Sequence, residues 1–254
     1  MFVVYKKIGE TPLACLKRTR KEQNIAEHIP MTYAGRLDPM AEGLLVLLVG
    51  DECKEKPAWT GLSKTYEFDI LVGFNTDTND LLGLVDSTSA KISGLREKSP
   101  DTEIFADLKE VLPLFLGEQI QTYPKYSSKP VNGTPLFLHT RNGTEVELPT
   151  HTIQIDELYC RGVSKISALD LKKTLHERIA LIQGDFRQEE ILHTWDSVLG
   201  AVPHTTFEII HCTVSCSSGT YVRQLVADMS EKLQIPLVTF SIKRTKIGEY
   251  SLDI

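Results

Sequence analysis

The feature that most constrains this chain is a turn rich in glycine and proline that leads into an entirely apolar run. The turn spans residues 33–43 and carries Asp38-Pro39, and the run spans residues 44–50. An apolar run this short, bounded by glycines, is typical of a buried strand. Asp38 is thereby placed at the edge of a hydrophobic core. Taken alone, an Asp-Pro pair before a strand is most simply a structural turn.

Alternation of apolar and polar residues predicts further strands. Residues 64–73 alternate cleanly, with Tyr66 on the same face as three apolar residues. Similar patterns occur in residues 2–8, 145–161, 205–216 and, as two short strands, 236–250. Strands and helices that mix without regular alternation favour an α+β fold with a mixed, mostly antiparallel central sheet flanked by helices and loops.

Helices are expected where apolar residues recur every three or four positions. Thr11 is a favourable N-cap for the first helix, because Pro12 then occupies the first helical position. Two consecutive helical patterns within residues 164–200 predict an inserted helical hairpin. The expected helices cover residues 12–24, 101–115 (capped by Asp101 or Thr102), 167–183, 188–199 and 222–233.

Three segments lack periodicity and are expected to be loops. Residues 74–80 are polar, and residues 87–100 suggest an exposed connection. Residues 119–143 interleave tyrosine, lysine, serine and proline, which predicts an ordered but mobile loop. That composition suits a grip on single-stranded nucleic acid, although an ordinary long loop fits it equally well.

Bulk composition, with 41% hydrophobic residues, is that of a globular protein and allows one large or two small domains. The net charge of −6 argues weakly against a partner held mainly by bulk electrostatics. Nucleic acid stays possible, because basic stretches occur at residues 17–21 and 243–246. No apolar run reaches membrane-spanning length, and we expect a soluble, cytoplasmic protein without membrane contact.

The cysteines and the absence of familiar motifs indicate a site without metal or cofactor. Five cysteines form no Cys-x-x-Cys pair, which fits a reduced compartment. Cys212 and Cys216 lie four residues apart without nearby histidine partners, so they make a poor zinc site. Phosphate-binding glycine loops and the metalloprotease and serine-hydrolase motifs do not occur in this chain.

Four separated segments together resemble the TruB-type pseudouridine synthases. Residues 35–43 carry the pattern Gly-x-Leu-Asp-Pro-x-Ala-x-Gly, which is similar to the family's catalytic motif, with Asp38 at the essential carboxylate. Residues 64–83, 126–143 and 216–248 resemble the family's second motif, its RNA-gripping insertion and its closing motifs. Each match is weak alone, but the four occur in the family's order along nearly the whole chain. The resemblance implies the pseudouridine synthase fold, with a single catalytic domain over residues 1–254.

The resemblance also implies roles for individual residues. Asp38 is expected to be the catalytic carboxylate, and addition to C6, attack on C1′ and removal of a sugar proton all stay open. Arg223 is expected to pair with Asp38 and hold it ionised. Tyr66 is expected to stack on the uracil and to assist the removal of the C5 proton. The implied substrate-binding residues are Tyr33, Lys64, Asp80, Lys129, Arg141 and Tyr221.

The chain departs from the family pattern in three respects. Tyr33 stands where many members have histidine, and one hypothesis is that it stacks on RNA instead. Lys129 sits one residue early, and Pro130 takes the usual place of the lysine. The resemblance ends near the last residue, so we expect no C-terminal PUA domain, and we expect the helices of residues 164–200 to be an addition.

The function that the resemblance implies is the isomerisation of uridine to pseudouridine in the T-loop of tRNA. The alternative is a non-catalytic RNA-binding or tRNA-folding protein on the same fold. The expected partner is the T-stem-loop of tRNA, without an obligate protein partner. We expect a monomer, because catalytic domains of this kind need no second copy to complete the site.

Overall fold

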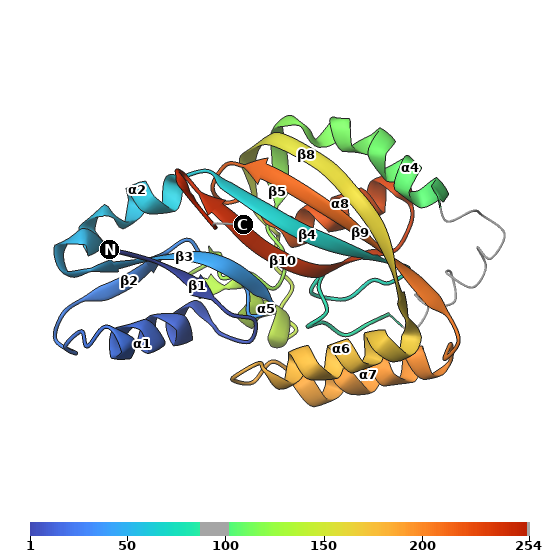
Figure 1. Cartoon of the computed structure of the whole chain (residues 1–254), viewed down its shortest axis with the longest axis horizontal. Helices are drawn as coiled ribbons and strands as arrows, with labels where there is room; N and C mark the ends of the chain where they lie inside the picture. Colours follow the sequence, from blue (N-terminus) through green and yellow to red (C-terminus); the bar gives the residue numbers. More distant parts are fainter. Residues whose placement is uncertain (87–101, 253–254) are drawn as a thin grey trace.

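The computed structural model describes residues 1–86 and 102–252. Its central sheet has the strand order β1-β3-β10-β4-β9-β8-β5, with β2 paired to β3 and β11 paired to β10 (Figure 1). The strands of this sheet are β1 (Phe2–Lys6), β2 (Met31–Ala34), β3 (Ala41–Val49), β4 (Lys64–Val72), β5 (Gly117–Thr122), β8 (Thr150–Ser167), β9 (Thr206–Cys216), β10 (Leu237–Ile247) and β11 (Tyr250–Ser251). A separate small hairpin consists of β6 (Pro130–Val131) and β7 (Thr134–Pro135).

The expected α+β class with a mostly antiparallel sheet is confirmed. Among the described strands, β3 and β10 pair in parallel, whereas the other pairs are antiparallel. The helices are α1 (Pro12–Glu22), α2 (Lys56–Gly61), α4 (Thr102–Val111), α5 (Leu136–Arg141), α6 (Ala168–Ala180), α7 (Gln188–Gly200) and α8 (Val222–Leu233), with 3-10 turns η1 (Gly50–Glu55) and η2 (Leu112–Phe115). None of the described helices is long and apolar enough to cross a membrane.

The two faces of β4 behave as the alternation predicts. Tyr66, Phe68 and Ile70 are buried in the main core, against apolar residues of α4 and α8. Burial of a side chain such as Phe68 stabilises the fold by about 1.5–3 kcal/mol. On the opposite face, Asp69 accepts a hydrogen bond from Ser241 at 2.5 Å and lies 2.7 Å from His211 Nδ1. Cross-strand polar pairs therefore satisfy Asp69 on this face, while Leu71 on the same face packs in a second core with α6 and α7.

The first helix begins where its capping residue predicts. The Ala14 amide donates to Thr11 Oγ1 at 3.1 Å, and Pro12 is the first helical residue. The helix ends at Glu22, two residues earlier than expected. It lies beside β1 and β2 at the N-terminal end of the sheet (Figure 1).

The predicted helical hairpin is present as α6 and α7, which lie side by side at one end of the sheet (Figure 1). Ser167 caps α6 by accepting a hydrogen bond from the Asp170 amide. Trp195 of α7 is fully buried, and its indole N–H donates to the Gly83 carbonyl at 3.2 Å. Its ring also packs at 5.1 Å on Phe74. The hairpin is thus fixed to the loop that follows β4.

Two expectations from the sequence are wrong in part. Residues 236–250 form one long strand, β10, and the short β11, because bulges near Thr239 and Arg244 interrupt the alternation without ending the strand. Residues 119–143 are not simply a loop, since they contain most of β5, the β6–β7 hairpin and α5. Ile120 is 78% exposed, so β5 is an edge strand with little apolar pattern to reveal it. The connection expected at residues 87–100 lies outside the described residues.

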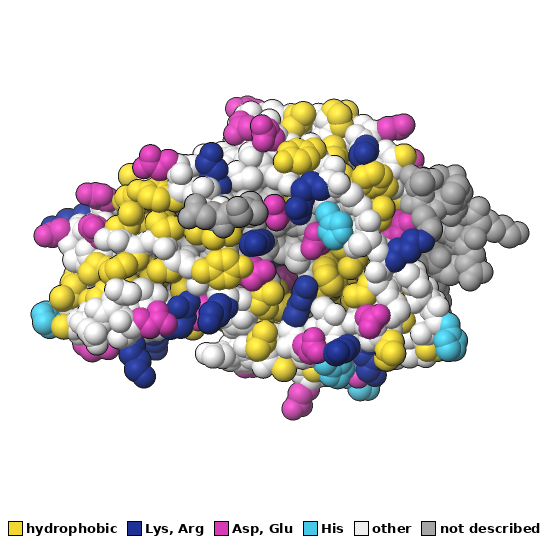
Figure 2. Space-filling view, in the orientation of Figure 1, with side chains coloured by type: hydrophobic (Ala, Val, Ile, Leu, Met, Phe, Trp, Pro, Cys, Tyr) yellow, Lys and Arg dark blue, Asp and Glu magenta, His cyan; other side chains and the backbone are white. Residues whose placement is uncertain are grey.

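The face seen in Figure 2 carries acidic and basic side chains interspersed with each other. The net charge of −6 is therefore not gathered into one acidic patch on this face. An RNA partner would respond to the local charges around its site rather than to the total.

Gly43 makes the parallel contact between β3 and β10 possible. It pairs with Arg244 at a φ of +111°, and an added Cβ would lie 2.3 Å from the Arg244 carbonyl oxygen. We therefore expect Gly43→Ala to lower the free energy of unfolding by about 2–6 kcal/mol, from backbone strain and overpacking together. Urea denaturation followed by circular dichroism measures this loss.

Gly61→Ala is the matched control, since an added Cβ there meets nothing within 4 Å. Its effect on the free energy of unfolding should stay below about 1 kcal/mol. Equal urea midpoints for the two variants would contradict the role of Gly43.

Candidate active site

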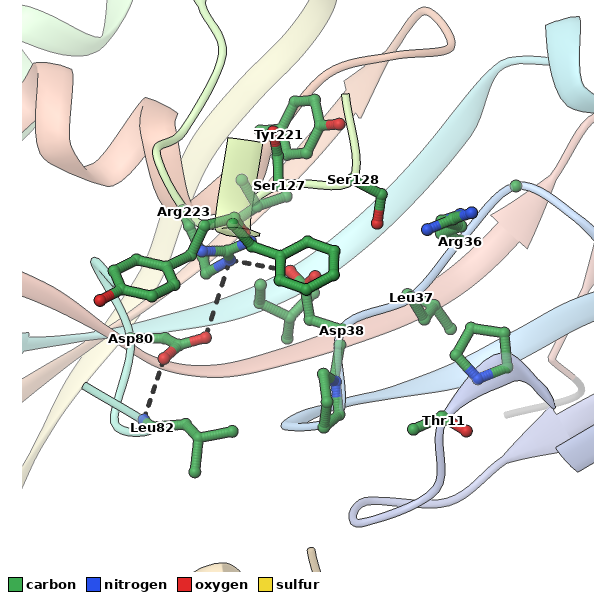
Figure 3. Close-up of a pocket in the computed structure, with 18 of the residues that line it drawn as sticks. Thr11, Arg36, Leu37, Asp38, Asp80, Leu82, Ser127, Ser128, Tyr221 and Arg223 are labelled. Atoms are coloured by element: carbon green, nitrogen blue, oxygen red, sulfur yellow. Dashed lines mark hydrogen bonds and ion pairs between the residues drawn. The ribbon is translucent and has the colours of Figure 1, made fainter. Parts of the chain in front are cut away.

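A cavity of about 710 Å³ opens between the β2–β3 turn, the loop after β4, the α5 region and the start of α8 (Figure 3). Eight of the nine residues expected in the site line it. These are Tyr33, Asp38, Lys64, Tyr66, Asp80, Arg141, Tyr221 and Arg223. Lys129 is not among the lining residues, and its ammonium lies 4.9 Å from the centre of the Tyr123 ring. The separated segments are therefore brought together around one hollow.

Asp38 projects into this cavity from the turn between β2 and β3 (Figure 3). Gly35 has a φ of +74°, which lets the chain reverse, and the Ala41 amide closes the turn on the Asp38 carbonyl at 3.1 Å. Leu37 is only 5% exposed and anchors the turn in the core. The Asp38 side chain is 38% exposed, so it faces the cavity while its backbone is fixed.

Arg223, in the first turn of α8, pairs with Asp38 as expected. Its Nε donates to Asp38 Oδ2 at 2.8 Å. Its Nη1 donates to the Thr78 carbonyl at 2.7 Å and its Nη2 to the Tyr126 carbonyl at 3.2 Å. The side chain is 3% exposed. Burial alone would lower the pKa of Arg223, but the carboxylates of Asp38 and Asp80 outweigh burial and raise it. The guanidinium is thus a permanent, fully oriented charge.

Asp80 is a second carboxylate beside the same Nε of Arg223 (Figure 3). Its Oδ2 is 3.7 Å from Arg223 Nε, and its Oδ1 accepts hydrogen bonds from Thr78 Oγ1 at 2.8 Å and from the Leu82 amide at 2.9 Å. Burial raises the pKa of Asp80, although Arg223 and both hydrogen bonds oppose that rise. Asp80 is thus largely buried and bonded within the protein while it also lines the cavity, and its predicted contact with substrate stays a prediction.

The two tyrosines frame the cavity from different elements. Tyr66 comes from β4 and is 8% exposed, and burial raises the pKa of its phenol. Tyr221 is the N-cap residue of α8, and Gln121 of β5 holds it by bonding both its amide and its carbonyl. The Tyr221 ring stands edge-on to Tyr123 at 5.6 Å. Both rings offer apolar surface to a planar ligand.

Two buried cations that sequence reasoning missed hold the Asp38 turn. Arg244 is 1% exposed and donates to the carbonyls of Leu44, Arg36 and Gly35 at 2.8, 3.2 and 3.3 Å. Lys6 is fully buried and donates to the Ala41 carbonyl at 2.5 Å. The closing motif includes Arg244, but no local pattern in the sequence shows that an arginine on β10 reaches a turn some 200 residues earlier.

The charge of Lys64 is bonded to backbone carbonyls just before its own strand. Its ammonium donates to the carbonyls of Thr60 and Leu62 at 2.6 and 2.5 Å. Burial, together with the nearby charge of Arg244, lowers the pKa of Lys64 to about 8. It lines the cavity, yet its hydrogen-bonding capacity is committed to the protein in this structure. Its predicted contact with substrate stays a prediction.

The rim of the cavity is more basic than the chain as a whole. Tyr33 lies 5.4 Å below the Lys56 ammonium. Arg36 is exposed at the rim and was not anticipated from the sequence (Figure 3). Arg141 pairs with Asp185 at 2.5 Å, and Arg187 also lines the cavity. Asp185 and Arg187 belong to the α6–α7 connection, which the sequence did not place at the site.

No group of three or more His, Cys, Asp or Glu side chains suited to a metal ion occurs within residues 1–86 and 102–252. Cys212 and Cys216 are both buried in β9. The groups that the cavity offers are carboxylate, guanidinium, phenol and aromatic ring.

The buried ammonium of Lys6 should make the stability of the protein depend on pH. Burial lowers the pKa of Lys6 from 10.5 to about 8, although Asp38 opposes that change. Between these two values the unfolded chain binds more protons than the folded one, so the stability that depends on this group rises with pH. We expect the unfolding free energy of the wild type, relative to Lys6→Met, to rise by about 3 kcal/mol across that window. Urea denaturation at several pH values measures the difference.

Lys7→Met serves as the control, because Lys7 is the exposed neighbour of Lys6. Its stability difference from the wild type should not follow this trend. A wild-type advantage over Lys6→Met that stays constant from pH 8 upward would show that burial does not destabilise the Lys6 charge.

Comparison with known proteins relates this arrangement to one family. The model described as "TruB family pseudouridylate synthase (N terminal domain)" matches residues 23–177. The tRNA pseudouridine synthase B of Bacillus velezensis is 32% identical over 253 residues, which are 100% of this chain and 66% of that protein. The Bacillus subtilis protein of the same name is 30% identical with the same coverage, and that of Bordetella avium is 29% identical, covering 98% of this chain and 80% of that protein.

This chain therefore spans just under two thirds of the length of its two Bacillus relatives. Among solved structures, a crystal structure of a Cbf5-Nop10-Gar1 complex superimposes with a TM-score of 0.54 at 16% identity, covering 98% of this chain and 49% of that chain. That likeness concerns the fold. Because the family model covers more than half of the residues and includes the Asp38 turn, the chain belongs to the TruB family of pseudouridylate synthases.

Proposed function

We propose that this protein converts uridine to pseudouridine in the T-loop of tRNA. The observation that carries the proposal is the Asp38–Arg223 ion pair at 2.8 Å, inside a cavity of the size that small ligands occupy. The relatives named tRNA pseudouridine synthase B, which match the whole chain, support tRNA as the substrate.

The reaction needs a carboxylate in an enclosed site. The bond between C1′ and N1 of the uridine breaks, the base turns, and C5 then bonds to C1′ with loss of its proton. Arg223 pairs with Asp38 and fixes the direction of its free lone pairs. Asp38 then acts by addition to C6, by attack on C1′ or by removal of a sugar proton. In each route the fixed guanidinium stabilises the Asp38 carboxylate when it forms again at the end of the reaction.

Tyr66 and Asp80 support this chemistry in different ways. Because burial raises the pKa of Tyr66, its phenol is neutral at neutral pH and does not begin the reaction as a base. Its role in the proposal is to stack on the uracil, and it removes the C5 proton only if its own proton leaves at the same time. Asp80, 3.7 Å from the same Nε that binds Asp38, helps to hold Arg223 in place.

The RNA must deliver its target base out of the helical stack. Extrusion costs a few kcal/mol in a structured RNA, and aromatic surface that replaces the lost stacking reduces that cost. Tyr221 and Tyr33 supply such surface at the cavity. Arg36 and Lys56 add positive charge at the rim, where the backbone phosphates would pass.

A non-catalytic RNA-binding protein on the same fold is the alternative. The buried charges of Arg223 and Asp80, which hold the partly exposed Asp38, favour the enzyme, because each charge taken out of water costs several kcal/mol and a binding surface needs neither of them. In the proposal the protein works on tRNA in the cytoplasm, as a monomer without an obligate protein partner.

Asp38→Asn tests the chemistry. It keeps the size of the side chain but removes the charge, so pseudouridine formation should fall by about 10³-fold or more. Unmodified tRNA transcript is incubated with each protein, and pseudouridine is mapped by carbodiimide modification. RNA affinity, measured by filter binding, should change only a few-fold.

Asp51→Asn is the control, because this carboxylate is 95% exposed and far from the cavity. Absence of product with the wild type, or equal product with Asp38→Asn, would overturn the enzymatic proposal. A T-stem-loop minihelix tests the substrate in the same assay, and product only on other RNAs would overturn the T-loop assignment.

Arg223→Lys tests the ion pair separately. Lysine keeps the charge beside Asp80 but cannot donate in the three directions that Arg223 uses. We expect kcat to fall by about 10²-fold while RNA affinity stays within a few-fold, because Asp38 loses its orientation. Single-turnover kinetics and filter binding measure the two quantities. A defect confined to affinity would count against the pairing.

A further inference from the structure

The connection between α6 and α7, residues 181–187, reaches the mouth of the cavity. Asp185, Phe186 and Arg187 of this connection all line the cavity. The geometry points to Arg187 as a positioning residue that holds the carbonyl acceptors of Arg223, and through Arg223 the orientation of Asp38. This inference rests on the proposed function, because it concerns the geometry of the same site.

Arg187 forms a closed cluster with one residue from each of two other segments. Its Nη1 donates to Asp77 Oδ2 at 2.8 Å, and Tyr126 donates its hydroxyl to the same oxygen at 3.0 Å. The guanidinium carbon of Arg187 also lies 4.9 Å from the centre of the Tyr126 ring. Each of the three side chains therefore contacts the other two, and Asp77 is the shared acceptor.

Two of the residues that Arg187 contacts lie directly beside the carbonyls that Arg223 binds. The carbonyl of Tyr126 itself accepts a hydrogen bond from Arg223 Nη2. The carbonyl of Thr78, the residue after Asp77, accepts one from Arg223 Nη1. Asp77 is itself fixed, since its Oδ1 accepts from the Leu84 amide at 2.8 Å. Both carbonyls that orient the catalytic guanidinium thus depend on segments that Arg187 ties together.

The connection that carries Arg187 is well ordered by its own contacts. Gln188 bonds the Phe186 amide at 2.9 Å and the Gly184 carbonyl at 2.6 Å. Arg187 itself has a φ of +63°, a left-handed conformation that is uncommon for a residue with a side chain. A strained backbone held in place by its surroundings is often found where a side chain must point in one direction. Here that direction is toward Asp77.

A second contact ties the same connection to the α5 region. Arg141 donates to Asp185 Oδ2 at 2.5 Å and to the Asp185 carbonyl at 3.4 Å. Asp185 is 74% exposed, so this pair contributes little by itself. The Arg187 side chain is 21% exposed, and its contacts are better shielded from water. Substitution of Arg187, rather than of Asp185, should therefore disturb the orientation of Arg223.

Arginine is required at this position because it supplies two things at once. Its N–H group satisfies the Asp77 carboxylate, and its planar face packs on the Tyr126 ring. Lysine would supply charge without the planar face. Arg187→Lys should therefore retain part of the effect, whereas Arg187→Ala should lose all of it.

The first measurement uses the enzyme's kinetics on tRNA transcript. For Arg187→Ala we expect kcat to fall on the order of 10-fold with KM nearly unchanged, and for Arg187→Lys a smaller fall. Lys173→Ala is the control, because Lys173 is an exposed residue of α6 that pairs only with Glu177 at 3.9 Å. A rise in KM alone would show that Arg187 contacts the RNA, and unchanged kinetics would show no role; either result overturns the inference.

The second measurement needs no activity. Hydrogen–deuterium exchange of the free protein should accelerate on the order of 10-fold at the amides of Asp77 and Phe137 in Arg187→Ala, because both are bonded within the segments that Arg187 ties together. Circular dichroism and the melting temperature verify that the variant is folded. Exchange equal to that of Lys173→Ala would overturn the positioning role. Absence of pseudouridine with the wild type would overturn the proposed function instead, and exchange would then decide the inference about Arg187 alone.

Discussion

The buried guanidinium of Arg223 is the interaction on which the rest of the site depends. Removing an ion from water costs several kcal/mol, and here two carboxylates and two backbone carbonyls offset that cost. These four acceptors come from three parts of the chain: Asp38 from the turn before β3, Thr78 and Asp80 from the loop after β4, and Tyr126 from the segment before α5. The need to satisfy one cation therefore draws these segments to the same point.

The same device recurs beneath the Asp38 turn. Arg244 and Lys6 are both buried, and both donate to backbone carbonyls of the turn and of the start of β3 rather than to carboxylates. Carbonyls in a turn have no strand partner, and buried ones must be satisfied by another donor. The turn that presents Asp38 is thus supported by cations from β10 and β1, so its shape is set by the core and not by the flexibility of its glycines.

Much of this arrangement could be predicted from the sequence. The apolar run after Asp38, the alternation around Tyr66 and the helix that begins at Val222 all follow from local periodicity, which burial enforces. The β5 strand could not be predicted, because an exposed edge strand needs no apolar face. Arg187 and Lys129 illustrate the other limit. Their contacts are with residues distant in sequence, and the spacing of residues along the chain does not predict which of several acceptors or rings a long basic side chain contacts.

One feature of the ion pair bears on how the protein is made. Asp38 and Arg223 are 185 residues apart in the chain. During synthesis the carboxylate leaves the ribosome long before its counter-ion, and a nascent chain of five or more strands still lacks the guanidinium. The cavity cannot take its final shape until α8 and β10 have been added, because β10 lies between β3 and β4 in the sheet. The Asp38–Arg223 pair and its cavity are therefore completed only when nearly the whole chain has been made, and a chain that ends before α8 carries Asp38 without its counter-ion.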